Sequence, residues 1–395
     1  MSAWPTLKLR ALATFRNGLN FAADARGKGL AIVGVRDFQD RSFVRYDELE
    51  ELNPSALSSR DSLIAKNDII FVRSNGNRDL IGRSLFVSEA PPMATSHSGF
   101  TIRLRLNDQR ALPLFFAYQL RGDIIRKVLS SKGGGTNINN LSQGILGDLD
   151  VTLPPLWEQQ RIADILGAYD DLIQVNRRRV ALLDDMARSL FEEWFVRLRF
   201  TSQPISVDEA PKGWSKIKVG DALKKFSRPE KVQKRDYVDA GSIPCIDQGA
   251  SLIGGYTENN AALINYSLPL CVFGDHTRIV KYINFPFASG ADGTQILSPI
   301  DRLSSEYLYF AIRKIDLSNH HYARHFKLLK AEEIWLPDTE TIKKFTLVTR
   351  PIMGKIQNLR FQNDVLARSR DLLLPRLISG QLSVAKAERE LAQAA

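Results

Sequence analysis

The feature of this sequence that most constrains its fold is a long apolar repeat near its middle. Between residues 162 and 194, apolar side chains follow one another at alternating steps of four and three residues, with one strongly polar member. The positions are Ile162, Leu166, Tyr169, Ile173, Asn176, Val180, Leu183, Ala187, Leu190 and Trp194. Such a heptad seam is typical of a helix that packs lengthwise against another helix, and a single Asn in the seam fixes register at some cost in stability. We expect this helix to begin near Leu156, after a pair of prolines, and to end near Arg199.

A second seam with the same period lies near the C-terminus. Its positions are Ile342, Phe345, Thr349, Ile352, Ile356, Leu359, Asn363, Leu366, Arg370 and Leu373. Adding 183 to a residue number in the first helix gives its counterpart in the second, so that Leu153-Pro154 corresponds to Leu336-Pro337. The sequence therefore contains the same helical piece twice. We expect Pro351 to kink the second copy and Pro375 to end it.

Each helical copy follows a globular stretch in which short β-rich runs alternate with Gly, Asn and Asp. The expected strands are 69–73, 83–87 and 100–106 in the first stretch and 269–273, 279–285 and 294–297 in the second, and the expected helices are 112–129 and 304–317. We predict an α+β protein with mixed, mainly antiparallel strands and helices in each domain. The predicted segments are domain 1 (1–155), a central helix (156–200), domain 2 (201–338, beginning with a polar linker at 201–213), a distal helix (339–384) and a tail (385–395).

The composition favours a basic protein that binds a nucleic acid. Lys and Arg number 54 against 44 Asp and Glu, and the formal net charge is +10. A positive balance of this size raises the odds of a nucleic-acid partner without requiring one. The two cysteines, Cys245 and Cys271, are too few for a disulfide framework, so we expect a reducing cytoplasm. No segment approaches the roughly 18 apolar residues of a membrane span, and the first residues lack the apolar run of a signal peptide.

Motifs for nucleotide and DNA chemistry are missing from the sequence. Lys132 precedes a run of three glycines, whereas a phosphate-binding loop places its Lys after them. No Asn or Asp is followed by Pro-Pro and an aromatic residue, as in adenine methyltransferases, and no Lys has an acid two residues before it, as in common metal-dependent nucleases. His321 and His325 would share one helical face at metal-ligand spacing, but a third ligand is not evident. Contact with a nucleic acid or plain solvated surface explains that segment as well.

Several motifs resemble those of one protein family. The string LPPLWEQQRI at 153–162, the residues 171–173 and the string LFEEWF at 190–195 resemble the central conserved region of the specificity subunits of Type I restriction-modification systems. Residues 372–382 are similar to the end of the distal conserved region of that family. The two-globule, two-helix layout resembles the whole family arrangement. The distal copy departs from it, because Asp338-Thr339-Glu340-Thr341 stands where the family usually keeps a Pro-Leu-x-Glu-Gln string.

The resemblance implies a DNA-reading subunit without catalytic activity or a bound cofactor. Each globular domain would be a target-recognition domain for one half of a split, asymmetric DNA site, and the helices would form an antiparallel coiled coil that sets the spacing. Two modification subunits would carry S-adenosylmethionine and the methyl transfer, and a restriction subunit would add translocation and cleavage with ATP and Mg²⁺. Exposed helix faces, including 157–161 and Arg177, Arg178 and Arg179, would bind these subunits.

Base readout needs polar side chains on loops or strand ends, with Lys, Arg and backbone amides on the phosphates. We expect such contacts from 73–78, 132–140, 226–235 and 275–278, and from the polar and aromatic segment 319–327. The side chains predicted to contact DNA are Arg73, Asn75, Asn77, Arg78, Lys132, Thr136, Asn137, Asn139, Arg228, Lys231, Lys234, Arg235, His276, Thr277, Arg278, His321 and Arg324. Two other interpretations stay open: a stand-alone DNA-acting enzyme with an unrecognised fold, and a structural coiled-coil adaptor without DNA affinity.

Overall fold

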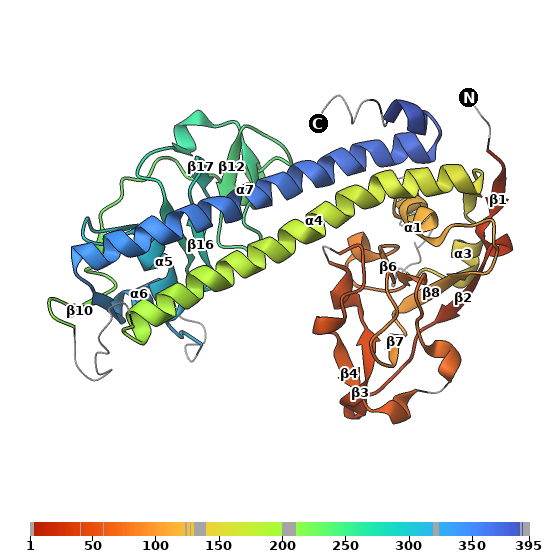
Figure 1. The fold of residues 1–395 in the computed structure, drawn as a ribbon, viewed down its shortest axis with the longest axis horizontal. Helices are drawn as coiled ribbons and strands as arrows, with labels where there is room; N and C mark the ends of the chain where they lie inside the picture. Colours follow the sequence, from red (N-terminus) through yellow and green to blue (C-terminus); the bar gives the residue numbers. More distant parts are fainter. Residues whose placement is uncertain are drawn as a thin grey trace. The chain divides into compact units, whose positions relative to one another are not determined.

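The structure, a computed structural model, describes residues 4–39, 41–57, 59–122, 125–126, 128–129, 140–199, 211–318, 324–387 and 389. The chain divides into two compact units. Unit 1 contains Met1–Ile173 and Asp364–Ala395, and unit 2 contains Gln174–Asn363. Each unit combines a globular α+β part with portions of two long helices, α4 (Leu156–Phe191) and α7 (Thr339–Ile378) (Figure 1). The predicted linker lies outside the described residues up to residue 210.

The globular part of unit 1 contains two small sheets and a separate strand pair. The first sheet has the order β2 (Ala13–Asn17), β8 (Thr101–Leu106), β5 (Ile69–Val72), β6 (Ser84–Phe86), and all its neighbours are antiparallel. The second has the order β4 (Glu50–Leu52), β3 (Arg26–Val33), β7 (Thr95–His97), with β3 and β7 parallel. The pair is β1 (Thr6–Lys8) with β9 (Asp150–Thr152), and the helices are α1 (Pro113–Arg121) and α3 (Gln143–Gly147).

The globular part of unit 2 repeats this plan. Its first sheet has the order β11 (Leu223–Lys224), β18 (Thr294–Pro299), β15 (Leu270–Gly274), β16 (Val280–Ile283). Its second has the order β13 (Gly255–Thr257), β12 (Ile243–Ile246), β17 (Phe287–Ser289), β14 (Leu263–Ile264), with β12 and β17 parallel. The strand pair is β10 (Ser215–Lys218) with β19 (Glu333–Leu336), and the helices are α5 (Ser305–Arg313) and α6 (His325–Ala331).

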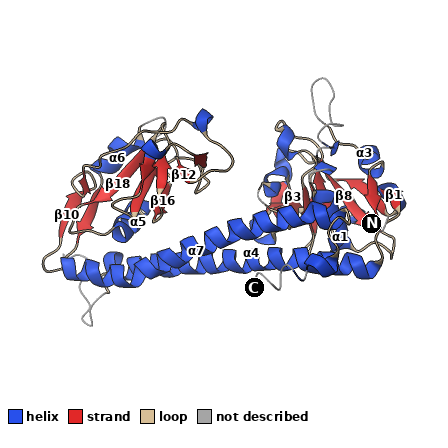
Figure 2. Ribbon diagram, turned by 90° about the horizontal axis from the view of Figure 1, so that it is seen from above, coloured by secondary structure: helices blue, strands red, loops and turns tan. Residues whose placement is uncertain are grey.

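The two globular parts therefore share one topology. The orders of both sheets correspond strand by strand, and β14 is the single added neighbour among the described strands. In each unit one parallel pairing interrupts an otherwise antiparallel arrangement. The predicted α+β class with mixed, mainly antiparallel strands is confirmed, and the duplication seen in the helices extends to both domains (Figure 2).

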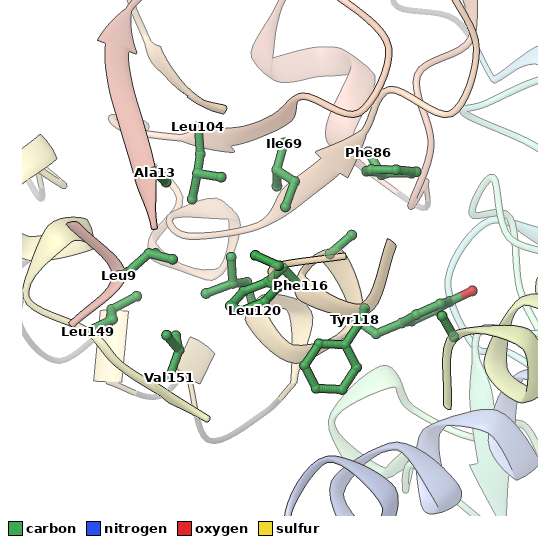
Figure 3. Close-up of a cluster of buried hydrophobic side chains, with 14 of the residues drawn as sticks. Leu9, Ala13, Ile69, Phe86, Leu104, Phe116, Tyr118, Leu120, Leu149 and Val151 are labelled. Carbon is green, nitrogen blue, oxygen red and sulfur yellow. The ribbon is translucent and has the colours of Figure 1, made fainter. Parts of the chain in front are cut away.

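The core of unit 1 lies between the first sheet, α1 and the long helices. Ile69, Phe86 and Leu104 come from the sheet, and Phe116 and Leu120 from α1 (Figure 3). The cluster continues onto α4 and α7 through side chains that include Ile162, Leu166, Leu374 and Leu377, all buried. Helix α1 is shorter than the expected 112–129, because Gly122 leaves the helical conformation at ψ 148°. Helix α5 is likewise shorter than 304–317.

The two long helices pack antiparallel within each unit. In unit 1 the start of α4 lies against the end of α7, and in unit 2 the end of α4 lies against the start of α7 (Figure 1). The seam positions on both helices are buried or half-buried. They are Ile162, Leu166, Tyr169, Ile173, Asn176, Val180, Leu183 and Leu190 on α4, Trp194 just after α4, and Phe345, Ile352, Ile356, Leu359, Asn363, Leu366 and Leu373 on α7. Among the described helices, none has a stretch long and apolar enough to cross a membrane.

The ends of the long helices differ from the sequence expectations. Helix α4 begins at Leu156 as expected, but it widens into a π-turn at Glu192–Val196 and does not reach Arg199. Helix α7 continues through Pro351. Because proline has no backbone N–H, the carbonyl of Leu347 loses its helical hydrogen bond. Leu347 is 77% exposed, so water can bind this carbonyl instead. The prediction that Pro375 ends the helix is wrong, because α7 runs on to Ile378.

Candidate nucleic-acid interface

In unit 1, loops that follow several strands meet at one end of the two sheets. We call residues 18–21, 34–36, 73–78 and 98–100 loop edge 1. Backbone hydrogen bonds join these loops: Leu19 N donates to His97 O at 2.8 Å, Ser98 N to Val33 O at 3.0 Å, and Arg73 N to Phe100 O at 2.8 Å. The backbone of Gly18 lies so close to Ser98 that only glycine fits there, since a Cβ on residue 18 would lie 2.1 Å from the carbonyl oxygen of Ser98. The loops therefore form one connected and closely packed edge.

The corresponding loops of unit 2 are joined in the same way. We call residues 228–233, 247–249, 275–278 and 290–293 loop edge 2. Val232 N donates to Ser289 O at 3.0 Å, Gly290 N to Ile246 O at 2.8 Å, and Asp275 N to Gly293 O at 2.7 Å. Each of these bonds has a counterpart in loop edge 1, as the shared topology requires. The same end of the same scaffold thus presents two different sets of side chains.

The side chains predicted to contact DNA in domain 1 are partly engaged in holding their own loop. Arg73 Nε donates to Asn140 Oδ1 at 3.1 Å. Asn75 Oδ1 accepts from the backbone N of Asn77 at 2.8 Å, and Asn77 Oδ1 accepts from Asp79 N at 3.0 Å. Arg78 is exposed. These bonds give the loop a fixed shape. The other four predicted residues of this domain, Lys132, Thr136, Asn137 and Asn139, lie outside the described residues.

In unit 2 two of the predicted arginines bind protein carbonyls. Arg228 is half-buried and donates to Thr294 O at 3.3 Å and to Gln295 Oε1 at 2.8 Å, and its burial lowers the pKa of its guanidinium. Arg278, in a left-handed conformation at φ 62°, donates to Leu317 O at 3.0 Å. Thr277 donates its hydroxyl to Gln248 O at 2.7 Å. Apart from Arg228, the predicted side chains described in this domain are exposed, namely Lys231, Lys234, Arg235, His276, Thr277, Arg278 and Arg324.

The histidines considered as metal ligands have a different role where they are described. His325 is buried, and its Nδ1 lies 2.8 Å from Asp275 O. The next residue, Phe326, donates its backbone N to Asp275 Oδ1 at 2.7 Å. The start of α6 is therefore fixed to loop edge 2. Within the described ranges, no group of three His, Cys, Asp or Glu residues could hold a metal ion, and His321 lies outside them.

The structure brings together segments that the sequence suggested separately. Asn140, at the end of the predicted 132–140 segment, pairs with Ser74, and the predicted 226–235 segment pairs with Gly290 through Val232. Sequence reasoning missed the loops 34–36 and 98–100, and 247–249 and 290–293. A local signal for two of them exists in the Ser-x-Ser-Gly of 96–99 and the Ser-Gly of 289–290, which stand at the ends of the short strands β7 and β17.

A buried histidine at the end of β7 lies beneath loop edge 1 and is hydrogen-bonded to Thr101. His97 is fully buried, and its Nδ1 lies 2.9 Å from Thr101 Oγ1. Because that hydroxyl donates to Ser98 O at 2.7 Å, it accepts from His97, which places the proton on Nδ1. Burial, with Arg103 and Arg16 nearby, lowers the pKa of His97 to about 3. The ring is therefore uncharged at neutral pH.

The outer faces of α4 carry exposed apolar side chains. Leu172, Val175, Leu182 and Met186 follow one another at steps of three, seven and four residues and are 44, 41, 64 and 55% exposed. They form a second stripe away from the seam. Trp157 is also exposed, at 60%. The expectation that all of 157–161 is an exposed face is wrong, because Gln159 is fully buried among backbone groups that it binds.

Comparison with known proteins gives one consistent result. The family model of the Type I restriction modification DNA specificity domain matches residues 3–183. The MjaIX specificity subunit of a Type I restriction enzyme from Methanocaldococcus jannaschii is 25% identical over 327 residues, which cover 76% of this chain and 75% of that protein. The putative MjaX specificity subunit of the same organism is 24% identical over 227 residues, 55% of this chain and 52% of the relative.

A solved structure supports the fold. The crystal structure of the Type I restriction-modification S subunit from M. genitalium aligns with a TM-score of 0.57 and 15% sequence identity, over 95% of this chain and 96% of that one. This alignment covers both globular parts and both long helices. The two chains therefore share a fold.

Proposed function

The chain carries a Type I DNA specificity domain over residues 3–183 and belongs to the family of Type I restriction-modification specificity subunits, and from this premise we propose how its parts divide the work. Loop edge 1 reads one half of a bipartite, asymmetric DNA site, and loop edge 2 reads the other half. The helices α4 and α7 set the distance between the halves. The chain itself performs no chemistry.

One observation carries this proposal: a single topology occurs twice, with different side chains at the same connected loop edge. By strand register, Arg36, Asn75 and Phe100 of loop edge 1 correspond to Gly249, Thr277 and Gly293 of loop edge 2. Duplication of a scaffold with divergent loops is what recognition of two unlike half-sites requires. A single active site would instead need its catalytic groups gathered in one place.

Partner subunits supply the chemistry in this proposal. Two modification subunits bind S-adenosylmethionine and transfer the methyl group, and a restriction subunit uses ATP and Mg²⁺. The exposed stripe of Leu172, Val175, Leu182 and Met186 is a suitable docking face, because large apolar side chains at heptad spacing on a helix surface favour helix-to-helix contact. Arg179 occupies the stripe position between Val175 and Leu182 and is exposed.

The decisive experiment is methylome sequencing of cells that carry the partner genes with and without this chain. We expect one bipartite, asymmetric methylation motif that depends on the chain. No motif, or a motif that persists without the chain, would contradict the proposal. Turnover of DNA by the purified chain alone would favour the stand-alone enzyme. Absence of DNA binding by the assembled complex across a salt series would favour the adaptor, since phosphate contacts make log affinity fall linearly with log salt.

Docking of the partners is tested by charge. Leu182→Glu combined with Met186→Glu should abolish copurification of the modification subunits, because two carboxylates would be desolvated in the interface. Thermal stability of the chain alone should change little, since both side chains are more than half exposed. Asp185→Lys, an exposed residue on a neighbouring face, is the control and should copurify normally.

The spacing role is tested by insertion. Seven residues added after Asn176 in α4, together with seven after Leu359 in α7, keep the heptad phase and lengthen each helix by about 10.5 Å. The gap between the half-sites should then grow by about three base pairs at roughly 3.4 Å each. Insertion of seven residues in α4 alone, which leaves the helices unequal in length, should prevent assembly. An unchanged gap in the double insertion would refute the spacing role.

A further inference from the structure

Loop edge 1 contains a cleft that has no counterpart in the sequence predictions. Its volume is about 580 Å³, and its walls include Gly34 and Arg36 after β3, Asn75 and Gly76 after β5, and Phe100 before β8. Gly76 leaves the entrance open, since a Cβ built there would meet nothing within 4 Å. The cleft therefore lies where all three loops meet, within the surface assigned to DNA.

Among the described residues, Arg36 makes two long ion pairs at this cleft but no side-chain hydrogen bond. Its Nε lies 3.7 Å from Asp37 Oδ1 and its Nη1 4.0 Å from Glu50 Oε2, and both distances are longer than a hydrogen bond. The side chain is 57% exposed. The predicted Arg73, by contrast, already donates its Nε to Asn140. Of these two arginines, Arg36 is the one with a donor fork available to an outside acceptor.

Phe100 holds a large apolar ring in the solvent at the same place. It is 62% exposed, although its backbone is fixed, because Arg73 N and Ser74 N both donate to its carbonyl, at 2.8 and 3.3 Å. A phenyl ring in this position loses the free energy that burial would give it. Next to it, the hydroxyl of Ser98 lines the cleft, buried and without a hydrogen-bond partner. A ligand that covers the ring and reaches Ser98 would satisfy both.

Unit 2 closes the corresponding place. Phe100 directly precedes β8, and Gly293 directly precedes the equivalent strand β18. Gly293 has φ 62°, and a Cβ on it would lie 2.6 Å from Oε1 of Gln248. The position of Gln248 is fixed by a hydrogen bond, because its Oε1 accepts from His276 N at 3.1 Å. The glutamine thus fills the space that stays open in unit 1. The two edges must read DNA with different groups.

We propose that Phe100 and Arg36 are the specificity-determining side chains of loop edge 1. The ring of Phe100 packs against the 5-methyl group of a thymine in the major groove, and Arg36 donates two hydrogen bonds to O6 and N7 of a guanine in the same half-site. Both pairings follow from the groups that the major groove displays: an apolar side chain suits the thymine methyl, and the planar fork of arginine suits guanine.

This inference rests on the proposed function, and the test separates the two. The assembled complex with its modification subunits is first used to obtain the methylation motif, and without a motif the proposed function fails. Binding is then measured on duplexes in which each thymine of the motif is replaced in turn by uracil, which lacks the 5-methyl group. We expect one thymine, in one half-site, whose replacement weakens binding by roughly threefold to tenfold, the scale of one buried methyl group.

Phe100→Ala should remove that thymine–uracil difference while leaving the other half-site unaffected. Met93→Ala, an exposed apolar residue of the same unit, is the matched control and should retain the difference. Arg36→Lys keeps the charge but loses the fork, so it should relax the motif at one guanine in that half-site, with a roughly tenfold loss of preference and an unchanged salt slope. A thymine–uracil ratio that Phe100→Ala leaves unchanged, or a motif that Arg36→Lys leaves intact, would overturn the inference.

Discussion

The start of α4 is held to its globular part by apolar packing and by a buried set of polar side chains, whereas its end is held mainly by aromatic rings. In unit 1, Gln159 is fully buried and donates to the carbonyls of Arg110 and Pro154 at 2.8 and 2.7 Å, while it accepts from Leu112 N at 2.8 Å. Farther along, Asp170 accepts from Tyr118 Oη at 2.7 Å and from the arginines 121 and 370.

In unit 2 the corresponding attachment is a cluster of rings. Phe195 lies 4.9 Å from Phe345 and 4.7 Å from Tyr307, between ring centroids, and Phe191 lies 5.7 Å from Tyr307. Nearly all of these contacts are edge-to-face or tilted, as aromatic quadrupoles prefer. The repeat thus conserves the pairing of helices and changes the chemistry that fixes them.

The difference teaches how one scaffold divides two tasks. Hydrogen bonds to backbone groups and a buried ion pair are directional, so they fix the rotation and register of a helix without adding much net stability. Aromatic packing has little directional demand and gives more free energy for each buried ring. We therefore expect the attachment of α4 in unit 2 to depend on side-chain volume and its attachment in unit 1 to depend also on charge.

The largest effect is expected from Phe345→Ala. Phe345 is fully buried on α7 beneath Phe191, Trp194 and Phe195, so its removal should lower the free energy of unfolding of unit 2 by about 3–5 kcal/mol. Denaturant unfolding followed by tryptophan fluorescence measures this, since Trp194 and Trp214 lie in or beside the cluster. Leu347→Ala, at 77% exposure on the same helix, should cost less than about 0.5 kcal/mol. Equal losses for both variants would contradict aromatic anchoring.

Asp170→Ala should be the next most damaging substitution. It leaves Arg121 and the hydroxyl of Tyr118 without this acceptor in a buried place and Arg370 with Asp371 alone, which costs about 3 kcal/mol. The loss should appear as faster amide hydrogen exchange in unit 1 and not in the aromatic cluster of unit 2. Asp171→Ala changes the exposed neighbour and is the control. The double variant with Arg370→Met should recover part of the loss, and a purely additive result would argue against the ion pair.

Acid should weaken unit 1 through His97. Its pKa is lowered to about 3 in the folded chain, from 6.5 in an unfolded chain, so the unfolded state binds the extra proton as the pH falls between these values. The free energy of unfolding should drop by about 1.4 kcal/mol per pH unit in that window, or about 2 kcal/mol from pH 6.5 to pH 5. His97→Gln should flatten this part of the pH dependence of exchange in β7. Unit 2 has Ser289 at the equivalent register position and should not share this histidine contribution. A slope that survives His97→Gln would exclude the histidine as its cause.

Local patterns predicted the helices and many strands of this fold. The heptad seams gave both long helices and the start at Leu156, since periodicity is a property of neighbouring residues. The heptad seams could not predict the π-turn. At this turn Phe191 and Phe195 are more buried than the seam residues Leu190 and Trp194. That shift depends on the rings of unit 2, which lie far away in the sequence.

The candidate site was less accessible to sequence reasoning. The loop after β5 could be predicted from its polar residues, but its neighbours in loop edge 1 depend on the parallel pairing of β3 with β7, which are more than 60 residues apart. No local pattern determines such a pairing. The sequence also did not predict that Asp170 is buried, because the heptad pattern places it beside the seam residue Tyr169. In the structure its carboxylate is buried among Tyr118 and two arginines that come from other parts of the chain.

The smallest expected effect comes from a matched pair of hydroxyl deletions. Tyr118 on α1 and Tyr307 on α5 are both buried, and burial raises the pKa of each, so both hydroxyls stay protonated and donate. Tyr118 donates to the carboxylate of Asp170 at 2.7 Å, whereas Tyr307 donates to the neutral carbonyl of Trp335 at 2.6 Å. Bonds to a charged acceptor are the stronger ones, so Tyr118→Phe should cost about 1.5 to 2 kcal/mol and Tyr307→Phe about 1 kcal/mol. Denaturant midpoints of the two variants measure the difference, and a larger loss for Tyr307→Phe than for Tyr118→Phe would contradict the stronger bond to the charged acceptor.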